Sequence, residues 1–322
     1  MRFRFSTCHA AAIACMLAPT AVAATAHATP AAAEQCGGWS ATQIASGYGM
    51  LESLEFDGRG GLLLSEQAAT GSGGGIRRLD ANGGRTTMAG DVDGPGMITV
   101  SGDTAYFTTG LSLQSKLTGR KGGIRSMDLR DGRLATVAEG LDMPNGIAAL
   151  PNGDFVVSSD MGADTRLTRV AGATIGPFGP PVTSTNGLAY DKSHNRLYVS
   201  STFNPTTTLT VVDLDHPSQP STIELPGFGP LNGADGVTIG PDGNLYIAYS
   251  TGGKVIRVDP TTHHWCTIAE NLPLTTEVKF GTGPGWAPNS LYATSYLGTV
   301  TRLTPADLQK FRCSAMCYTK LH

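Results

Sequence analysis

One strand-rich pattern recurs six times between Leu51 and Leu303, and this repeat limits the possible folds more than any other feature. Each copy has a polar or glycine-containing start, an apolar strand, a tight turn, a second apolar strand, a loop and a third strand. The copies occupy residues 51–80, 97–128, 145–160, 186–215, 235–260 and 278–303. Four repeats separate Glu52 from Asp235, about 46 residues each, which is the length of a four-stranded propeller blade. The sequence therefore predicts an all-β fold, a six-bladed β-propeller with a central channel.

The turns between the apolar strands support this prediction. Asn152-Gly153 and Asp242-Gly243 offer the positive φ angles that tight connections need. The sixth copy lacks an outer strand, which residues 39–45 could supply, so the propeller is expected to span residues 39–303. In the remaining tail, residues 304–322, the run Thr304-Pro305-Ala306-Asp307 is typical of a helix start. One short C-terminal helix is therefore expected through residues 308–311.

The N-terminus has the pattern of an export signal. Arg2 and Arg4 precede an apolar, alanine-rich run, and Ala26-His27-Ala28 fits a signal-peptidase site. Residues 1–28 are predicted to be a cleaved signal peptide, followed by an N-terminal segment at 29–38. A lipoprotein acylated at Cys15 would need a longer apolar run before that cysteine. The protein is thus expected to be secreted or periplasmic, and no later stretch has the ~20 apolar residues of a membrane span.

Four cysteines follow the predicted cleavage site: Cys36, Cys266, Cys313 and Cys317. In an oxidising compartment an even number suggests two disulfides, with three possible connectivities. The closely spaced C-terminal pair lacks the partners of a zinc site. The expected pairing joins Cys36 to one member of that pair and Cys266 to the other.

Composition limits the partners. A net charge of −3 and a charged content of 15% leave no basic stripe, so nucleic acid is excluded as an expected partner. No amphipathic helix or heptad pattern indicates a partner chain, and a monomer that acts on a small molecule is expected. A GxSxG elbow, an HExxH motif and a P-loop are all absent from the sequence.

A candidate metal site emerges at the starts of the repeats. The first strand of a blade lies nearest the axis, so the first residue of each copy should project into the channel. Those positions hold Glu52, Gly96, Asn145, Asn186, Asp235 and Glu277 or Val278. Oxygen donors from four blades (Glu52, Asn145, Asn186 and Asp235) suit a divalent cation: calcium first, then magnesium or manganese, with zinc less suited to an all-oxygen set. The alternative is that Asn-Gly and Asp-Gly pairs only form turns.

Substrate is expected at the same end of the channel, where the loops between second and third strands also lie. These loops are residues 68–75, 110–123, 160–164 and 202–208, and the longest, 110–123, is either a lid or a plain surface loop. Glu66 and Asp160, near the ends of second strands, are weaker candidates for substrate contact, with solvated surface carboxylates as the alternative.

Several motifs resemble one known family. ESLEF at 52–56, NGL at 186–188, the run ADGVTIGPDGNLYIAYSTGGKVIRVDP at 234–260 and KFG at 279–281 resemble the senescence marker protein, gluconolactonase and luciferin-regenerating enzyme family. The resemblance implies a six-bladed propeller with one axial divalent cation, often calcium, and lactone hydrolysis. By the same resemblance Glu52, Asn186 and Asp235 match metal ligands, Asn145 faces metal and substrate, and Asp235 matches the general base.

One departure bears on the substrate. Family members that act on sugar lactones tend to carry an arginine shortly before the asparagine that corresponds to Asn145, and the run here is Leu141-Asp142-Met143-Pro144. The expected function is a secreted, metal-dependent hydrolase of cyclic esters in which Asp235 activates water. The alternatives are an organophosphate or aryl ester hydrolase that uses the same site, as in the similar paraoxonases and diisopropyl fluorophosphatase, and a propeller that binds a ligand or protein without catalysis.

Overall fold

The structure is a computed structural model that describes residues 36–68, 73–162 and 165–306. All of them belong to one compact unit, residues 33–322. The predicted signal peptide, the predicted helix at 308–311, Cys313 and Cys317 lie outside the described residues.

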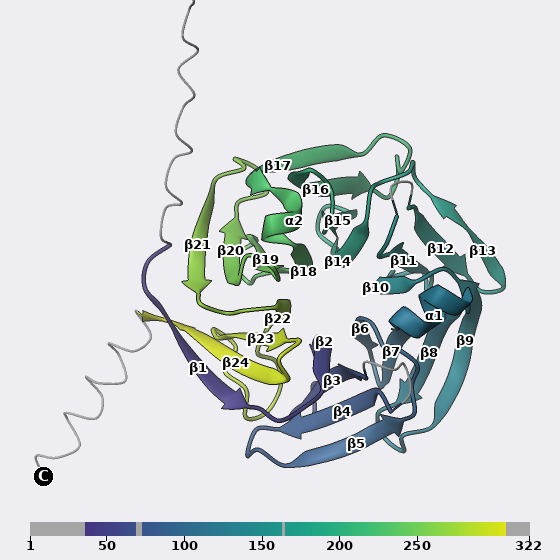
Figure 1. The fold of residues 1–322 in the computed structure, drawn as a ribbon, viewed down its shortest axis with the longest axis horizontal. Coiled ribbons are helices and arrows are strands. Elements are labelled where there is room, and N and C mark those ends of the chain that lie inside the picture. Colours follow the sequence, from purple (N-terminus) through teal and green to yellow (C-terminus); the bar gives the residue numbers. More distant parts are fainter. Residues whose placement is uncertain (1–35, 69–72, 163–164, 307–322) are drawn as a thin grey trace, which may run out of the picture. The chain divides into compact units, whose positions relative to one another are not determined.

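Six four-stranded antiparallel sheets surround a central axis, as the repeat predicts (Figure 1). Blade one contains β2 (Met50–Phe56), β3 (Gly61–Gln67), β4 (Gly75–Asp80) and β5 (Arg85–Gly90); blade two β6 (Ile98–Ser101), β7 (Thr104–Thr109), β8 (Gly122–Asp128) and β9 (Leu134–Leu141); blade three β10 (Pro144–Ala149), β11 (Phe155–Ser159), β12 (Leu167–Ala171) and β13 (Thr174–Phe178). Blade four contains β14 (Thr185–Asp191), β15 (Arg196–Ser201), β16 (Thr206–Asp213) and β17 (Ser221–Phe228); blade five β18 (Ala234–Ile239), β19 (Leu245–Tyr249), β20 (Lys254–Val258) and β21 (Trp265–Glu270); blade six β22 (Thr275–Phe280), β23 (Leu291–Ser295), β24 (Thr299–Pro305) and β1 (Trp39–Ala45). The first strands, β2, β6, β10, β14, β18 and β22, line the centre (Figure 1).

The ring closes as predicted, because β1 is the outer strand of blade six. It runs antiparallel to β24, with Trp39 opposite Pro305 and Ala45 opposite Val300. The last blade thus combines the two ends of the propeller, and every blade has four strands.

The predicted cysteine pairing is wrong. Cys36 bonds Cys266 on β21 of blade five, with the Cα atoms 5.3 Å apart. The Cys36 amide also donates to the Thr267 carbonyl at 3.0 Å. The reason is the path of the chain: the segment before β1 passes along the outer strand of the preceding blade, so the disulfide fastens the closure to blade five.

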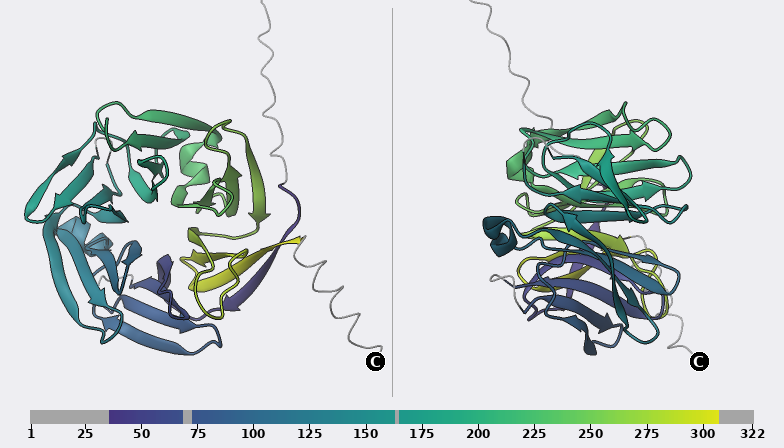
Figure 2. Two further views of the ribbon diagram at one scale, coloured as in Figure 1. Left: turned by 180° about the vertical axis from the view of Figure 1, so that it is seen from behind. Right: turned by 90° about the vertical axis from the view of Figure 1, so that its right-hand side faces the viewer.

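Two short helices occur among the described residues, and the sequence reasoning named neither. Helix α1 (Leu113–Thr118) lies inside the 110–123 loop; Ser112 caps it by accepting from the Ser115 amide, and Gly119 ends it in the left-handed conformation. Helix α2 (Gly229–Asn232) joins blades four and five, with proline in its first turn. Both project from the same face of the propeller (Figure 2). No helix in the described ranges is long and apolar enough to cross a bilayer.

The core lies between neighbouring blades. Alternate residues of each strand face the next sheet, so the apolar pattern of period two buries one cluster in each gap. Between blades one and two, for example, Leu63 and Ile76 pack against Phe107 and Met127, and all four are fully buried. This packing fixes the angle between blades and therefore the positions of the first strands around the axis.

Candidate functional site

The four predicted ligands lie at the starts of four first strands, at the end of the propeller that we call the site end. Glu52, Asn145, Asn186 and Asp235 are all buried, with exposed fractions of 5% or less. Each occupies a break in the pairing register between first and second strands, such as the one between Pro144 and Ile147 in blade three. Such breaks re-aim a side chain that a regular ladder would direct elsewhere.

Glycines follow three of these residues for a reason other than a turn. Gly146, Gly187 and Gly236 have no positive φ angle, so the turn interpretation of these Asn-Gly and Asp-Gly pairs is wrong. A Cβ at Gly146 would collide with the carbonyl oxygen of Asn186, and one at Gly187 with that of Asp235. Glycine therefore lets adjacent first strands approach each other closely around the axis.

Hydroxyl groups of the second strands hold the backbone of the site in place. Ser158 on β11 accepts from the Gly146 amide at 2.7 Å and donates to the carbonyl of Asn186 in the next blade at 2.6 Å. Ser200 on β15 makes the corresponding bond to the carbonyl of Asp235. These bonds satisfy the backbone groups that the broken ladder leaves free, and they link each blade to the next.

Two of the four side chains bond each other directly, and a third accepts a bond from Tyr296. Asn145 donates through Nδ2 to Oδ1 of Asn186 at 2.8 Å, and Asn186 donates through Nδ2 to Oγ1 of Thr202 at 2.9 Å. Glu52 accepts a hydrogen bond at Oε2 from the hydroxyl of Tyr296. Oδ1 of Asn145 is buried without a hydrogen-bond partner. A buried amide oxygen without a partner is costly, so its place in this acidic cluster indicates a site for a ligand.

The carboxylates of the cluster disfavour each other's charge. Burial, together with the charges of Asp160 and Glu277, raises the pKa of Glu52 to about 7. Hydrogen bonds from Tyr296 and Asn145 act in the opposite direction and lower it. Burial, followed by the charges of Glu52, Asp160 and Glu277, raises the pKa of Asp235 well above its usual range. Burial also raises the pKa of Asp160 to about 6, although the charge of Lys116 lowers it. The cluster thus holds several buried carboxyl groups, and each one disfavours the charged form of its neighbours.

The structure separates the two weaker candidates. Asp160 joins the cluster, with Oδ1 3.5 Å from Nδ2 of Asn186. Glu66 bonds Arg77 and accepts from the Gly49 amide at 2.6 Å, so its carboxylate is committed to structural contacts. The pairing register explains the difference. Glu66 pairs with Leu51 in blade one, and Ser159 pairs with Pro144 at the same position of blade three. Asp160 therefore lies one residue beyond the position that is equivalent to Glu66. A shift of one residue turns a strand side chain to the opposite face.

The pairing register also corrects the predicted channel-facing residue of the sixth blade. Thr275 pairs with Ser295, so Thr276 is the residue equivalent to Asn145, and neither Glu277 nor Val278 occupies that position. Tyr296 and Thr202 are equivalent to Asp160, one residue beyond their second strands. Sequence reasoning missed both, although comparing this repeat position across the blades would have identified them.

The donor set fits a hard divalent cation. Its members are two carboxylates and two amides, one of which has a free oxygen, and such oxygens are typical ligands of calcium and magnesium. Within the described ranges, no three His, Cys, Asp or Glu side chains are grouped to hold a metal. The candidate set is therefore one of mixed carboxylate and amide oxygens.

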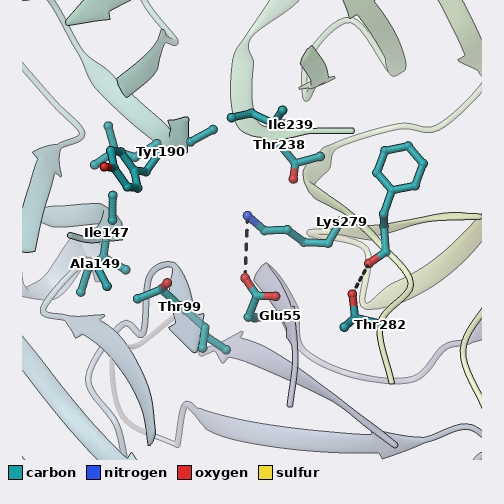
Figure 3. A pocket seen from close by; sticks show the side chains of 14 residues that line it. Glu55, Thr99, Ile147, Ala149, Tyr190, Thr238, Ile239, Lys279 and Thr282 are labelled. Atoms are coloured by element: carbon teal, nitrogen blue, oxygen red, sulfur yellow. Dashed lines mark hydrogen bonds and ion pairs between the residues drawn. The ribbon is translucent and has the colours of Figure 1, made fainter. Parts of the chain in front are cut away.

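A different charged group occupies the opposite end of the channel. Lys279 projects into a cavity of about 390 Å³, toward Glu55 (Figure 3). Its Nζ lies 3.9 Å from Oε2 of Glu55 and 3.9 Å from Oε2 of Glu277, which is itself fully buried. Burial disfavours the charged amine, but the two carboxylates outweigh this effect and raise the pKa of Lys279. Lys279 thus neutralises Glu55 and Glu277, and the charge of Glu277 in turn acts on Glu52 and Asp235.

Comparison with known proteins agrees with the fold. A search of curated proteins finds no significant match. Solved structures that share the fold include the calcium-binding protein regucalcin from Agrobacterium tumefaciens (17% identity, TM-score 0.64, 83% of this chain and 94% of that one) and a gluconolactonase from Xanthomonas campestris (14%, 0.62, 82% and 89%). A luciferin-regenerating enzyme is similar too (18%, 0.61, 83% and 95%).

The sequence itself shows the family. The model of the SMP-30/Gluconolactonase/LRE-like region matches residues 72–296, which cover most of the propeller and three of the four candidate ligands. With its six blades, the chain therefore belongs to the SMP-30/gluconolactonase/LRE-like family.

Proposed function

We propose that this protein is a divalent-cation-dependent hydrolase of cyclic esters that acts at the site end of the channel. The observation that carries the proposal is the unpartnered Oδ1 of Asn145 beside two buried carboxylates whose pKa values are raised. Glu52, Asn145, Asn186 and Asp235 would hold the cation. Family membership and the likeness to a gluconolactonase support the assignment to the hydrolases.

The chain's own residues divide the chemistry as follows. When bound, the cation would supply Lewis acidity that polarises the ester carbonyl and favours negative charge on its oxygen. Asp235 accepts a proton from water as the water oxygen bonds to the carbonyl carbon. The ring C–O bond then breaks, and Asp235 returns the proton to the leaving alkoxide, so that lactone and water become a hydroxy acid. Tyr296 orients Glu52, and Thr202 orients Asn186.

We favour calcium as the cation, and we favour a location outside the cytoplasm, after export. Mixed carboxylate and amide oxygens suit calcium, and the likeness to the calcium-binding regucalcin agrees with this choice. The Cys36–Cys266 disulfide agrees with an oxidising compartment such as the periplasm or the extracellular space. N-terminal sequencing of the mature protein from its native host should begin at Thr29; an intact Met1 terminus would contradict export by this signal.

A substrate panel tests the proposed activity. γ- and δ-lactones, an aryl acetate and a phosphotriester are offered to the wild type with calcium and after EDTA treatment. Lactone hydrolysis should require calcium and should fall at least about 100-fold in Asp235→Asn, because a general base contributes at least that factor. Asp191→Asn is the matched control: Asp191 is buried at the opposite end of β14, where it bonds Ser193 and His194.

Each outcome of this panel assigns a different function to the site. Hydrolysis of the phosphotriester without hydrolysis of lactones would make the protein an organophosphate hydrolase. Calcium binding without turnover of any substrate would make it a binding propeller. Lactone hydrolysis that survives both EDTA and Asp235→Asn would overturn the proposed mechanism.

A further inference from the structure

The surface around the site end is unusually apolar. Of the large hydrophobic side chains that are exposed in the described residues, the six most exposed all lie at this end, five in connections and Phe228 at the last position of β17. They are Leu113 and Leu117 of α1, Phe228 and Leu231 at α2, Phe203 and Leu297, with exposed fractions from 49% to 78%. We call these six residues the apolar collar. Scattered apolar residues are normal on a surface, but their concentration around one opening indicates a binding function.

Three polar side chains of the same connections are turned inward. Ser112 and Ser115 beneath α1 donate to Asp93. Asn232 of α2 donates to Oγ1 of Thr207 at 2.7 Å and to the carbonyl of Pro226 at 3.0 Å. These bonds occupy Ser112, Ser115 and Asn232 within the protein, while α1 exposes Leu113 and Leu117 beside the polar side chains of Gln114, Lys116 and Thr118.

The collar surrounds the opening above the acidic cluster. Its members come from blade two, blade four, the link between blades four and five, and blade six, and α1 and α2 project on that face (Figure 2). A cavity of about 450 Å³ opens at the same end, and both apolar residues (Leu141, Val157 and Met161) and polar ones (among them Asp142 and Arg166) line it. Sites for small molecules typically enclose about 300–1,000 Å³. The cavity wall includes Pro144 and Ser159, the sequence neighbours of Asn145 and Asp160.

We propose that the substrate is a lactone with an apolar side chain, and that the apolar collar binds this chain while the ester lies at the cluster. This inference rests on the proposed function and names its substrate class. The leucine and phenylalanine side chains of the collar offer no hydrogen bond to a hydroxyl group, so they favour contact with an apolar substituent over contact with a polyhydroxylated one. An alkyl chain needs only apolar surface.

A homologous series measures the effect of the collar. The kcat/KM values of γ-butyrolactones with methyl, propyl, pentyl and heptyl side chains are compared below the concentration at which they aggregate. We expect an increase of about two- to fourfold per methylene, since each fully buried methylene is worth about a factor of four and the collar buries a chain partially. Leu117→Ser combined with Leu231→Ser should flatten this slope. Ile175→Ser, an exposed isoleucine at the opposite end, is the matched control.

The outcomes separate this inference from the proposed function. Hydrolysis of the methyl lactone with no gain along the series would overturn the inference and leave the hydrolase intact. If no lactone is hydrolysed, calorimetric binding of the heptyl lactone that the double variant loses would support the collar while the proposed function fails. Absence of both would overturn both. A flat series, together with collar-dependent cosedimentation with phosphatidylcholine vesicles, would overturn the inference and assign the collar to a lipid surface.

Discussion

Asn145 donates a hydrogen bond of 2.8 Å to Asn186 across two neighbouring blades, and its own carbonyl oxygen is left buried without a partner. The bond fixes which atom of each amide faces the cluster: Nδ2 of Asn145 is used, and Oδ1 is free. Two neighbouring blades thus present one oriented oxygen in the cluster that includes Glu52 and Asp235.

Replacing Asn145 should weaken cation binding. Asn145→Ala removes the free oxygen and the partner of Asn186, so calcium affinity should fall at least tenfold, equivalent to about 1.4 kcal/mol. The measurement is calcium titration followed by calorimetry. Asn82→Ala, at an exposed asparagine in the turn between β4 and β5, should keep the wild-type affinity, and equal affinity in both variants would contradict the role of Asn145.

Removing a charge from the cluster should stabilise the cation-free protein. Glu52, Asp160 and Glu277 all disfavour the charged form of Asp235. Asp235→Asn should therefore raise the midpoint of urea unfolding in EDTA, while calcium should stabilise the wild type more than the variant. A lower midpoint for the variant in EDTA would show that the repulsion is not significant.

Much of this arrangement could be predicted because the repeat has a fixed phase. Turn residues and alternating apolar residues locate the strands, and the polar starts of first strands identify Glu52, Asn145, Asn186 and Asp235 as one set. The repeat could not distinguish adjacent positions. Glu66 and Asp160 differ by one residue in register, and a single sequence does not show which face of the sheet each side chain takes. The disulfide prediction was wrong for another reason. Cys36 and Cys266 come together only because the chain before β1 runs along blade five.

Ser158, whose hydroxyl group links blade three to blade four, should contribute to stability. Ser158→Ala leaves the Gly146 amide and the Asn186 carbonyl buried without their shared partner, so the free energy of unfolding should fall by about 1–3 kcal/mol. Ser159→Ala on the same strand removes only a solvent-exposed bond to the Asp142 carbonyl and should change it by about 0.5 kcal/mol or less. Urea denaturation compares the two, and similar losses would mean that the inter-blade bond has no special role.

The charged group at the opposite end should matter for folding. Lys279→Met leaves Glu277 and Glu55 without a cation, so at pH 8 the free energy of unfolding should fall by about 3 kcal/mol. Adding Glu277→Gln to this variant should restore most of the loss, whereas Lys192→Met on the surface should have little effect. A double variant as unstable as Lys279→Met alone would contradict this explanation.

The pH dependence of stability should show the burial of Glu277. Burial raises the pKa of Glu277 from 4.5 to about 7. Between these values the folded protein keeps a proton that the unfolded chain has released, so this residue lowers the free energy of unfolding as pH rises. Glu277→Gln removes the effect, and the variant should gain stability relative to the wild type between pH 5 and pH 7.5 in EDTA. A difference that does not change with pH would contradict the raised pKa.

Calcium titration of the EDTA-stripped protein by isothermal calorimetry will show whether four blades together hold one divalent cation. We expect one calcium ion per chain at pH 7.5, and no binding after Glu52→Gln combined with Asp235→Asn. If neither calcium, magnesium nor manganese binds stoichiometrically to the wild type, the account of this site is wrong.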